Sequence, residues 1–101
     1  MICVLASIRV KEGAREAFLD IFNENVPKVK GEAGCIEYFP ALDVDAALPV
    51  QVRDEKVVTI IEKWQSVEAL HAHLASPHML EYKERVRDLV EEVTLKVLQP
   101  V

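Results

Sequence analysis

The residues best suited to chemistry lie in one stretch, Glu62 to Met79, which contains the only tryptophan of the chain and all three histidines. His73 is the first candidate for a general base, because an imidazole titrates near neutral pH. Glu62 and Trp64 are two residues apart on a predicted strand, so their side chains share a face. If that face lines a pocket, Glu62 is a base or an orienter of His73, and Trp64 is an apolar wall.

Each of these three residues also has a purely structural interpretation. A partly buried histidine often only fills space and makes hydrogen bonds, and this alternative applies to His73. Trp64 is more simply a core anchor, and Glu62 would then pair with a lysine or an arginine. A carboxylate without a partner would be costly there, so we expect Glu62 to have one under either interpretation.

Two further side chains complete the candidate substrate-binding set. Tyr38 either donates its hydroxyl group to a substrate oxygen or packs its ring and leaves the hydroxyl in water. His78 falls in the first turn of a predicted helix, where backbone N–H groups favour an anion. It is therefore either a polar pocket wall or a surface residue, and His71 is expected to face solvent.

The histidines and cysteines do not have the spacing of a metal site. His71 and His73 are two apart on a helix, roughly 200° around its axis, so they cannot both reach one ion. Cys3 and Cys35 form neither a zinc pattern nor a disulfide framework. Because no glycine-rich phosphate loop is present either, we expect no metal and no nucleotide or flavin held through its phosphates.

The elements that must position these residues follow from the apolar patterning. A β-branched run before Trp64 predicts a strand, and Ser66 and Ser76–Pro77 are typical of helix starts. Asp43–Lys56 has no clear period and reads as a loop, in which Val50 and Val52 could form a short edge strand. The predicted strands are Ile2–Val10, Cys35–Leu42, Val57–Trp64 and Val93–Leu98; the predicted helices are Ala14–Lys30, Val67–Leu74 and Pro77–Asp88.

The helices are amphipathic, and one contains a proline. Pro27 lies inside the first helix and should kink or shorten it. The last helix is expected to bury Met79, Tyr82, Val86 and Leu89, and the second to bury Val67, Leu70 and Leu74. The apolar stripe of the first helix is Ala14, Phe18, Ile21, Phe22, Val26 and Val29.

This order of elements predicts an α+β, ferredoxin-like β-α-β-β-α-β fold, with the helices on one face of a four-stranded antiparallel sheet. Residues 1–101 are expected to form a single domain. The opposite sheet face carries too many apolar residues to remain in water. Pairing two sheets face to face would bury it, so we expect a homodimer.

Composition excludes several classes of protein. With 12 Lys and Arg against 17 Asp and Glu, the net charge is −5, and no basic stripe suggests a nucleic-acid partner. No apolar run approaches the ~20 residues that span a bilayer, and the first residues lack the basic start of a signal peptide. A cytoplasmic protein with free thiols and no membrane association is the expectation.

The chain resembles the antibiotic biosynthesis monooxygenase (ABM) family, and within it the small quinol monooxygenase-like proteins. The resemblance spans nearly the whole chain. It rests on the order of elements and on Glu32–Tyr38, Glu62-Lys63-Trp64, Ala69-Leu70, His73 and Ser76-Pro77-His78. It implies a dimeric α/β barrel, a small-molecule pocket between sheet and helices, and in many members oxygenation without metal or flavin.

The haem-degrading members of that family differ from this chain at two positions. Their first-strand asparagine falls at about Ala6 and their haem-ligating histidine at about Lys83. Without that histidine there is no obvious axial ligand, so we do not expect haem degradation.

Together these observations predict a homodimeric, cofactor-independent monooxygenase that oxidises a quinol or a similar electron-rich aromatic with O₂. A base would form the phenolate, and an apolar pocket would hold this anion with O₂. Two alternatives stay open: a dimeric module that binds a small apolar molecule without chemistry, and a related isomerase of a small metabolite.

Overall fold

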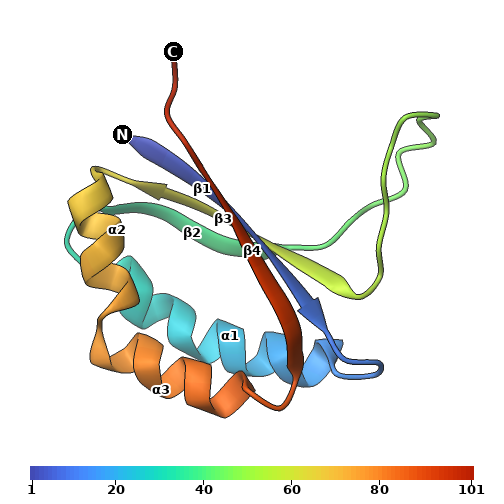
Figure 1. The fold of residues 1–101 in the computed structure, drawn as a ribbon, viewed down its shortest axis with the longest axis horizontal. Coiled ribbons are helices and arrows are strands. Elements are labelled where there is room, and N and C mark those ends of the chain that lie inside the picture. Colours follow the sequence, from blue (N-terminus) through green and yellow to red (C-terminus); the bar gives the residue numbers. More distant parts are fainter.

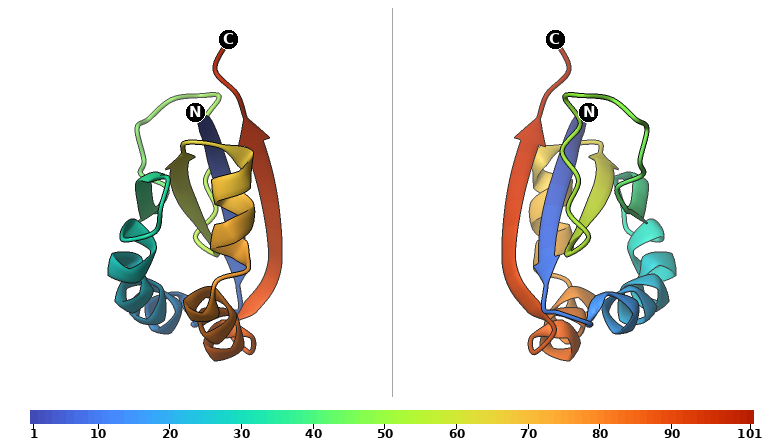
Figure 2. Two further views of the ribbon diagram at one scale, coloured as in Figure 1. Left: turned by 90° about the vertical axis from the view of Figure 1, so that its left-hand side faces the viewer. Right: turned by 90° about the vertical axis from the view of Figure 1, so that its right-hand side faces the viewer.

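The computed structural model describes all 101 residues and has the predicted α+β architecture. Four antiparallel strands form one sheet in the order β2-β3-β1-β4, and three helices lie on one side of it (Figures 1 and 2). This is the ferredoxin-like β-α-β-β-α-β order, with the second α element divided in two. The elements are β1 (Ile2–Val10), α1 (Arg15–Lys30), β2 (Cys35–Ala41), β3 (Val57–Trp64), α2 (Val67–Leu74), α3 (Pro77–Val86) and β4 (Val90–Leu98).

The boundaries differ from the prediction mainly near the end of the chain. Helix α3 ends at Val86 instead of Asp88, and β4 begins at Val90 instead of Val93. The N–H of Leu89 donates to the carbonyl of Val86 at 2.9 Å, which closes a turn between the two elements. Apolar alternation is incomplete in this region, so the sequence pattern does not reveal where the strand starts.

Helix α1 passes through Pro27 without the predicted shortening. It continues to Lys30, and the N–H of Gly31 donates to the carbonyl of Pro27 at 3.2 Å. A proline this close to the end removes one N–H donor and leaves the remaining hydrogen bonds of the last turn intact. No helix of the chain is both long enough and apolar enough to cross a membrane.

The core lies between the helices and the sheet. Alternate residues of β1 and β3 point into it, which gives both strands an alternating burial pattern. The predicted stripe of α1 faces this core, and so do Met79, Tyr82 and Val86 of α3. In α2, Leu70 is buried as predicted, whereas Val67 is exposed, contrary to the prediction.

Residues 43–56 form a connection without helix or strand that projects far from the sheet, here called the arm (Figure 1). The predicted edge strand at Val50 and Val52 is not formed, and both side chains are among the most exposed apolar groups of the chain. The arm is held by its own polar groups. The side-chain amide of Gln51, for example, donates to the carbonyl of Val44.

The sheet face opposite the helices carries an apolar row. Leu5 of β1 pairs with Ile61 of β3, and Ile61 pairs with Phe39 of β2. All three side chains are at least partly exposed, and Phe39 reaches 40%. No element of the chain covers this row, and the face-to-face pairing of two sheets stays a prediction.

The turn between α1 and β2 approaches α2 closely. Gly34 has φ +85°, in the left-handed region that favours glycine, and its carbonyl accepts a hydrogen bond from the N–H of Gln65 at 2.8 Å. A Cβ atom at Gly34 would lie 2.7 Å from the Cβ of Ala69 in α2. Gly34 therefore allows this turn, which contains Glu32, to lie against α2.

We predict that Gly34→Ala destabilises the protein more than Gly13→Ala does. Both glycines have positive φ, which costs an alanine about 1–2 kcal/mol, but nothing lies within 4 Å of the Cβ position at Gly13. At Gly34 the clash with Ala69 adds the cost of overpacking, typically about 1–3 kcal/mol. Urea unfolding of both variants measures the difference, and equal destabilisation would contradict the close approach.

Candidate functional site

A largely apolar cavity of about 330 Å³ lies between the sheet and the helices. This volume falls at the lower end of the range of small-molecule sites, about 300–1,000 Å³. Twelve of its sixteen lining residues are hydrophobic, and they come from β1, α1, the middle of β2, β3, the end of α2, α3 and β4. The four polar residues of the lining are Glu62, His73, Lys83 and Arg87.

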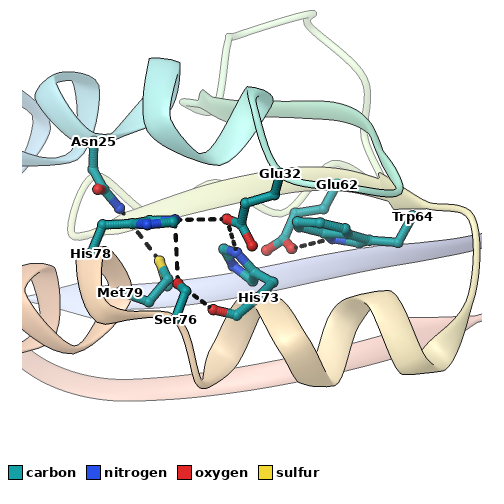
Figure 3. A network of polar contacts seen from close by, with 8 residues as sticks. All are labelled: Asn25, Glu32, Glu62, Trp64, His73, Ser76, His78 and Met79. Carbon is teal, nitrogen blue, oxygen red and sulfur yellow. Dashed lines mark hydrogen bonds and ion pairs between the residues drawn. The ribbon is translucent and has the colours of Figure 1, made fainter.

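His73, on α2, is almost completely buried, with only 1% of its surface exposed. Its Nδ1 lies 2.8 Å from Oε2 of Glu32, in the turn that Gly34 brings against α2 (Figure 3). Because a carboxylate only accepts, Nδ1 carries the proton and donates it. Nε2 makes no hydrogen bond within the chain, and because every fully buried polar side-chain atom has a partner, Nε2 is accessible and its lone pair is available to a molecule in the cavity. This is the tautomer that a general base requires.

The same Glu32 oxygen also lies 2.9 Å from Nε2 of His78, so one carboxylate joins two imidazoles (Figure 3). The hydroxyl of Ser76 donates to the carbonyl of His73 at 2.8 Å and lies 3.2 Å from the same His78 nitrogen. Since the Ser76 proton is already used, His78 donates from Nε2 to both oxygens. The break between α2 and α3 at Ser76 thus places the two histidines on either side of Glu32.

Glu62, on β3, is buried in the cavity wall with one hydrogen bond inside the chain. Nε1 of Trp64 donates to its Oε1 at 2.9 Å, and Oε2 has no partner (Figure 3). Burial is the main cause that raises the pKa of Glu62 to about 7, and the hydrogen bond from Trp64 opposes that shift. Near neutral pH this carboxyl group is therefore able to carry a proton and donate it to an oxygen atom in the cavity.

Burial shifts the pKa of His73 in the opposite direction. Desolvation lowers it, the hydrogen bond with Glu32 raises it in part, and the charges of His78 and Lys83 lower it further. Burial also raises the pKa of Tyr38 and of Tyr82 far above neutrality, so both phenols stay protonated. The interior of the cavity is therefore close to neutral, which suits an aromatic ligand.

Aromatic rings form one side of the site. The rings of His73 and Trp64 have centroids 4.6 Å apart, and Tyr38 meets the His73 ring edge-on at 5.4 Å. Tyr38 in turn stacks on Phe22, with centroids 5.3 Å apart. These contacts fix the plane of the His73 ring in addition to its tautomer.

The structure brings three of the five predicted site residues to the cavity. His73, Glu62 and Tyr38 line it, whereas Trp64 is fully buried behind it as a core anchor. His78 lies outside, half-buried beside a small surface hollow of about 50 Å³.

Two sequence-based interpretations of Glu62 are wrong. The carboxylate that orients His73 belongs to Glu32, and the partner of Glu62 is Trp64 rather than a lysine or an arginine. Glu32 is the residue that the sequence reasoning missed as a site residue. His71 faces solvent as predicted.

No group of three His, Cys, Asp or Glu side chains has the arrangement of a metal site. Ala6 and Lys83, at the positions where haem-degrading relatives are expected to carry asparagine and histidine, both line the cavity. At the position of the haem-ligating histidine, Lys83 therefore offers an ammonium group in place of an imidazole.

Residues 1–85 match the sequence profile of the family described as antibiotic biosynthesis monooxygenase. The chain is also 40% identical, over 102 aligned residues, to the Escherichia coli K12 protein named "Probable quinol monooxygenase YgiN". That alignment covers 99% of this chain and 98% of the relative.

Solved structures share the fold over nearly the full length. The structure of Rv0793 from Mycobacterium tuberculosis matches with a TM-score of 0.81 and 26% identity, covering 99% of this chain and 94% of that one. PA3566 from Pseudomonas aeruginosa matches with a TM-score of 0.82 and 24% identity, covering 99% and 93% of the two chains. The match to PA3566 supports the fold alone.

We predict that Glu62→Gln removes a pH dependence of stability. In the folded protein the pKa of Glu62 is about 7, against 4.5 as its ordinary value. The stabilisation from protonated Glu62 is fully present below pH 4.5 and is lost as the pH rises through 7, by up to roughly 3 kcal/mol. Denaturant unfolding of both proteins between pH 4.5 and 8 measures this.

The contribution of His73 has the opposite sign, because its lowered pKa costs stability as the pH falls. It is common to both proteins and cancels in the difference between them. Parallel stability curves for wild type and Glu62→Gln would show that the carboxyl group is not buried as described.

Proposed function

The chain belongs to the antibiotic biosynthesis monooxygenase family, and from this premise we propose a cofactor-independent monooxygenase. Its substrate is a quinol or a similar small electron-rich aromatic, and its oxidant is O₂. The observation that carries the proposal is a single buried histidine in an apolar cavity. That histidine, His73, is held by Glu32 in the tautomer that leaves Nε2 free.

In the proposed reaction, Nε2 of His73 removes the proton of a phenolic hydroxyl group. The resulting anion gives electrons to O₂ far more readily than the neutral phenol does. One oxygen atom enters the ring, and the other leaves as water with the ring hydrogen and the proton that His73 removed. The product is a quinone, so the substrate supplies all four electrons that O₂ accepts and no external reductant is needed.

The other cavity residues have supporting roles in this proposal. Protonated Glu62 donates a hydrogen bond from its free oxygen to a developing negative charge, and Tyr38 is a second donor in the wall. Trp64 holds Glu62, and Glu32 is a positioning residue for His73. His78 fixes Glu32 from the solvent side.

The proposal includes a homodimer in which two sheets pack face to face as an α/β barrel. The apolar row of Leu5, Phe39 and Ile61 supports it, because this face is otherwise left in water. Residues 1–101 form one domain in this proposal. The protein is expected to be located in the cytoplasm.

The test of the reaction is O₂ consumption by metal-stripped protein with benzene- and naphthalene-1,4-diols. We predict uptake above autoxidation that falls about 10²–10⁴-fold in His73→Ala, the usual range for loss of a general base. His71→Ala is the matched control, since His71 lies on the same helix and faces solvent. No uptake by folded wild-type protein would contradict the oxygenase and favour a binding module or an isomerase.

The role of Glu32 has its own readout in that assay. Because Glu32 raises the pKa of His73, Glu32→Gln should move the acidic limb of the kcat/KM profile to lower pH and lower its maximum. A uniform loss of activity with an unshifted profile would point to a merely structural Glu32.

The dimer is tested by light scattering on the eluted protein. We predict twice the chain mass of 11.4 kDa for wild type. Phe39→Glu should give monomers, because a charge in the apolar row cannot be buried without a partner. Val50→Glu, a control substitution in the arm, leaves the row intact and should remain dimeric. A monomeric wild type would overturn the face-to-face pairing.

A further inference from the structure

The cavity has two chemically different polar regions. Glu62 and His73 lie deep inside and are nearly inaccessible to solvent. Lys83 and Arg87 belong to the same lining but are exposed residues at the end of α3. The wall between them is apolar, so a ligand that fills the cavity meets hydrogen-bonding groups inside and positive charge at the mouth.

The two cations lie on one side of their helix. They are four residues apart, and Arg87 still has helical angles, with φ −50° and ψ −43°. Residues at this spacing are neighbours on a helix surface. Both side chains therefore project toward the cavity mouth from adjacent turns, so that one anionic group could contact both.

Neither cation is firmly occupied by a carboxylate. Lys83 makes no ion pair in the chain. Arg87 reaches Glu84 at 3.1 Å and Asp88 at 3.9 Å, and all three side chains are at least two-thirds exposed. Exposed pairs of this kind contribute little, so Arg87 is free to change partner.

We propose that the substrate of this cavity carries an anionic group, such as a carboxylate, which Lys83 and Arg87 bind at the mouth. Its hydroxylated aromatic ring then lies inside, with the hydroxyl group at His73 and Glu62. The substrate class is a hydroxyaromatic acid, with the acid and the reacting hydroxyl on opposite sides of the ring system. This inference rests on the proposed function only in taking this cavity as the substrate site.

The overall charge of the chain makes the local cations significant. At −5 the protein as a whole repels anions. Two cations at an apolar opening reverse that preference at one place, and they orient the ligand with its uncharged end inward. An anion could not occupy the inner end without losing its hydration next to Glu62.

Binding of 6-hydroxy-2-naphthoate, compared with its uncharged methyl ester, tests the proposal. In this probe the hydroxyl and the carboxylate stand at opposite ends of two fused rings. Isothermal titration under anaerobic conditions measures dissociation constants without turnover. We expect the acid to bind about tenfold more tightly than the ester, a preference of about 1.4 kcal/mol that weakens as salt is added.

The variant Lys83→Met keeps the apolar stem and removes the charge. It should abolish most of the preference for the acid, by lowering the affinity for the acid far more than the affinity for the ester. Lys11→Met is the matched control, because Lys11 is exposed, makes no ion pair and lies outside the cavity.

The outcomes separate this inference from the proposed oxygenase. A preference for the acid that depends on Lys83 supports the anionic substrate even if no diol is oxidised. Equal affinities for acid and ester, a preference that survives Lys83→Met, or no binding of either probe would overturn it, whatever the oxygen assay shows.

Discussion

The hydrogen bond between Glu32 and His73 connects the parts of this molecule that the cavity needs. It joins the turn after α1 to the helix after β3, and through His78 it also reaches α3. One carboxylate oxygen thus fixes three segments around one wall of the site. The bond is nearly free of water, since the side chain of His73 is 1% exposed and that of Glu32 is 13% exposed. In such surroundings, loss of Glu32 leaves the Nδ1 donor of His73 without a partner, whereas loss of His73 leaves Glu32 its bond to His78.

Burial then decides the charge state of the interior. The same desolvation raises the pKa of Glu62 and lowers that of His73, so it favours the uncharged form of both groups. No buried side-chain nitrogen or oxygen of the chain lacks a hydrogen-bond partner. The polar atoms without a partner inside the chain are therefore accessible ones, and among them Nε2 of His73, Oε2 of Glu62 and the hydroxyl groups of Tyr38 and Tyr82 belong to residues that line the cavity. This combination of a satisfied core and accessible, unpaired polar atoms is what makes the cavity suited to chemistry.

The sequence predicts the order of elements well and the polar network only in part. Periodicity is clear in β1, α1 and β3, and these strands and this helix lie where it places them. Glu62 and His73 can be predicted as site residues from the sequence because they lie on a predicted strand and on the predicted helix that directly follows it. Glu32 cannot be found in this way, since it lies in a turn without periodicity, 41 residues from His73 along the chain. Its contact depends on how closely Gly34 lets two backbones approach, which no pattern of residue types encodes.

The arm has a practical consequence for engineering the protein. Residues 43–56 add almost nothing to the core, and their hydrogen bonds are mostly with one another. The base of the arm is tied to the sheet by the ion pair between Arg9 and Asp54, at 2.7 Å, while the tip near Leu48 stands free. Exposed tips of this kind accept inserted sequence with little effect on the rest of a domain. A peptide tag or a fluorescent reporter placed there would leave the cavity and its histidine undisturbed.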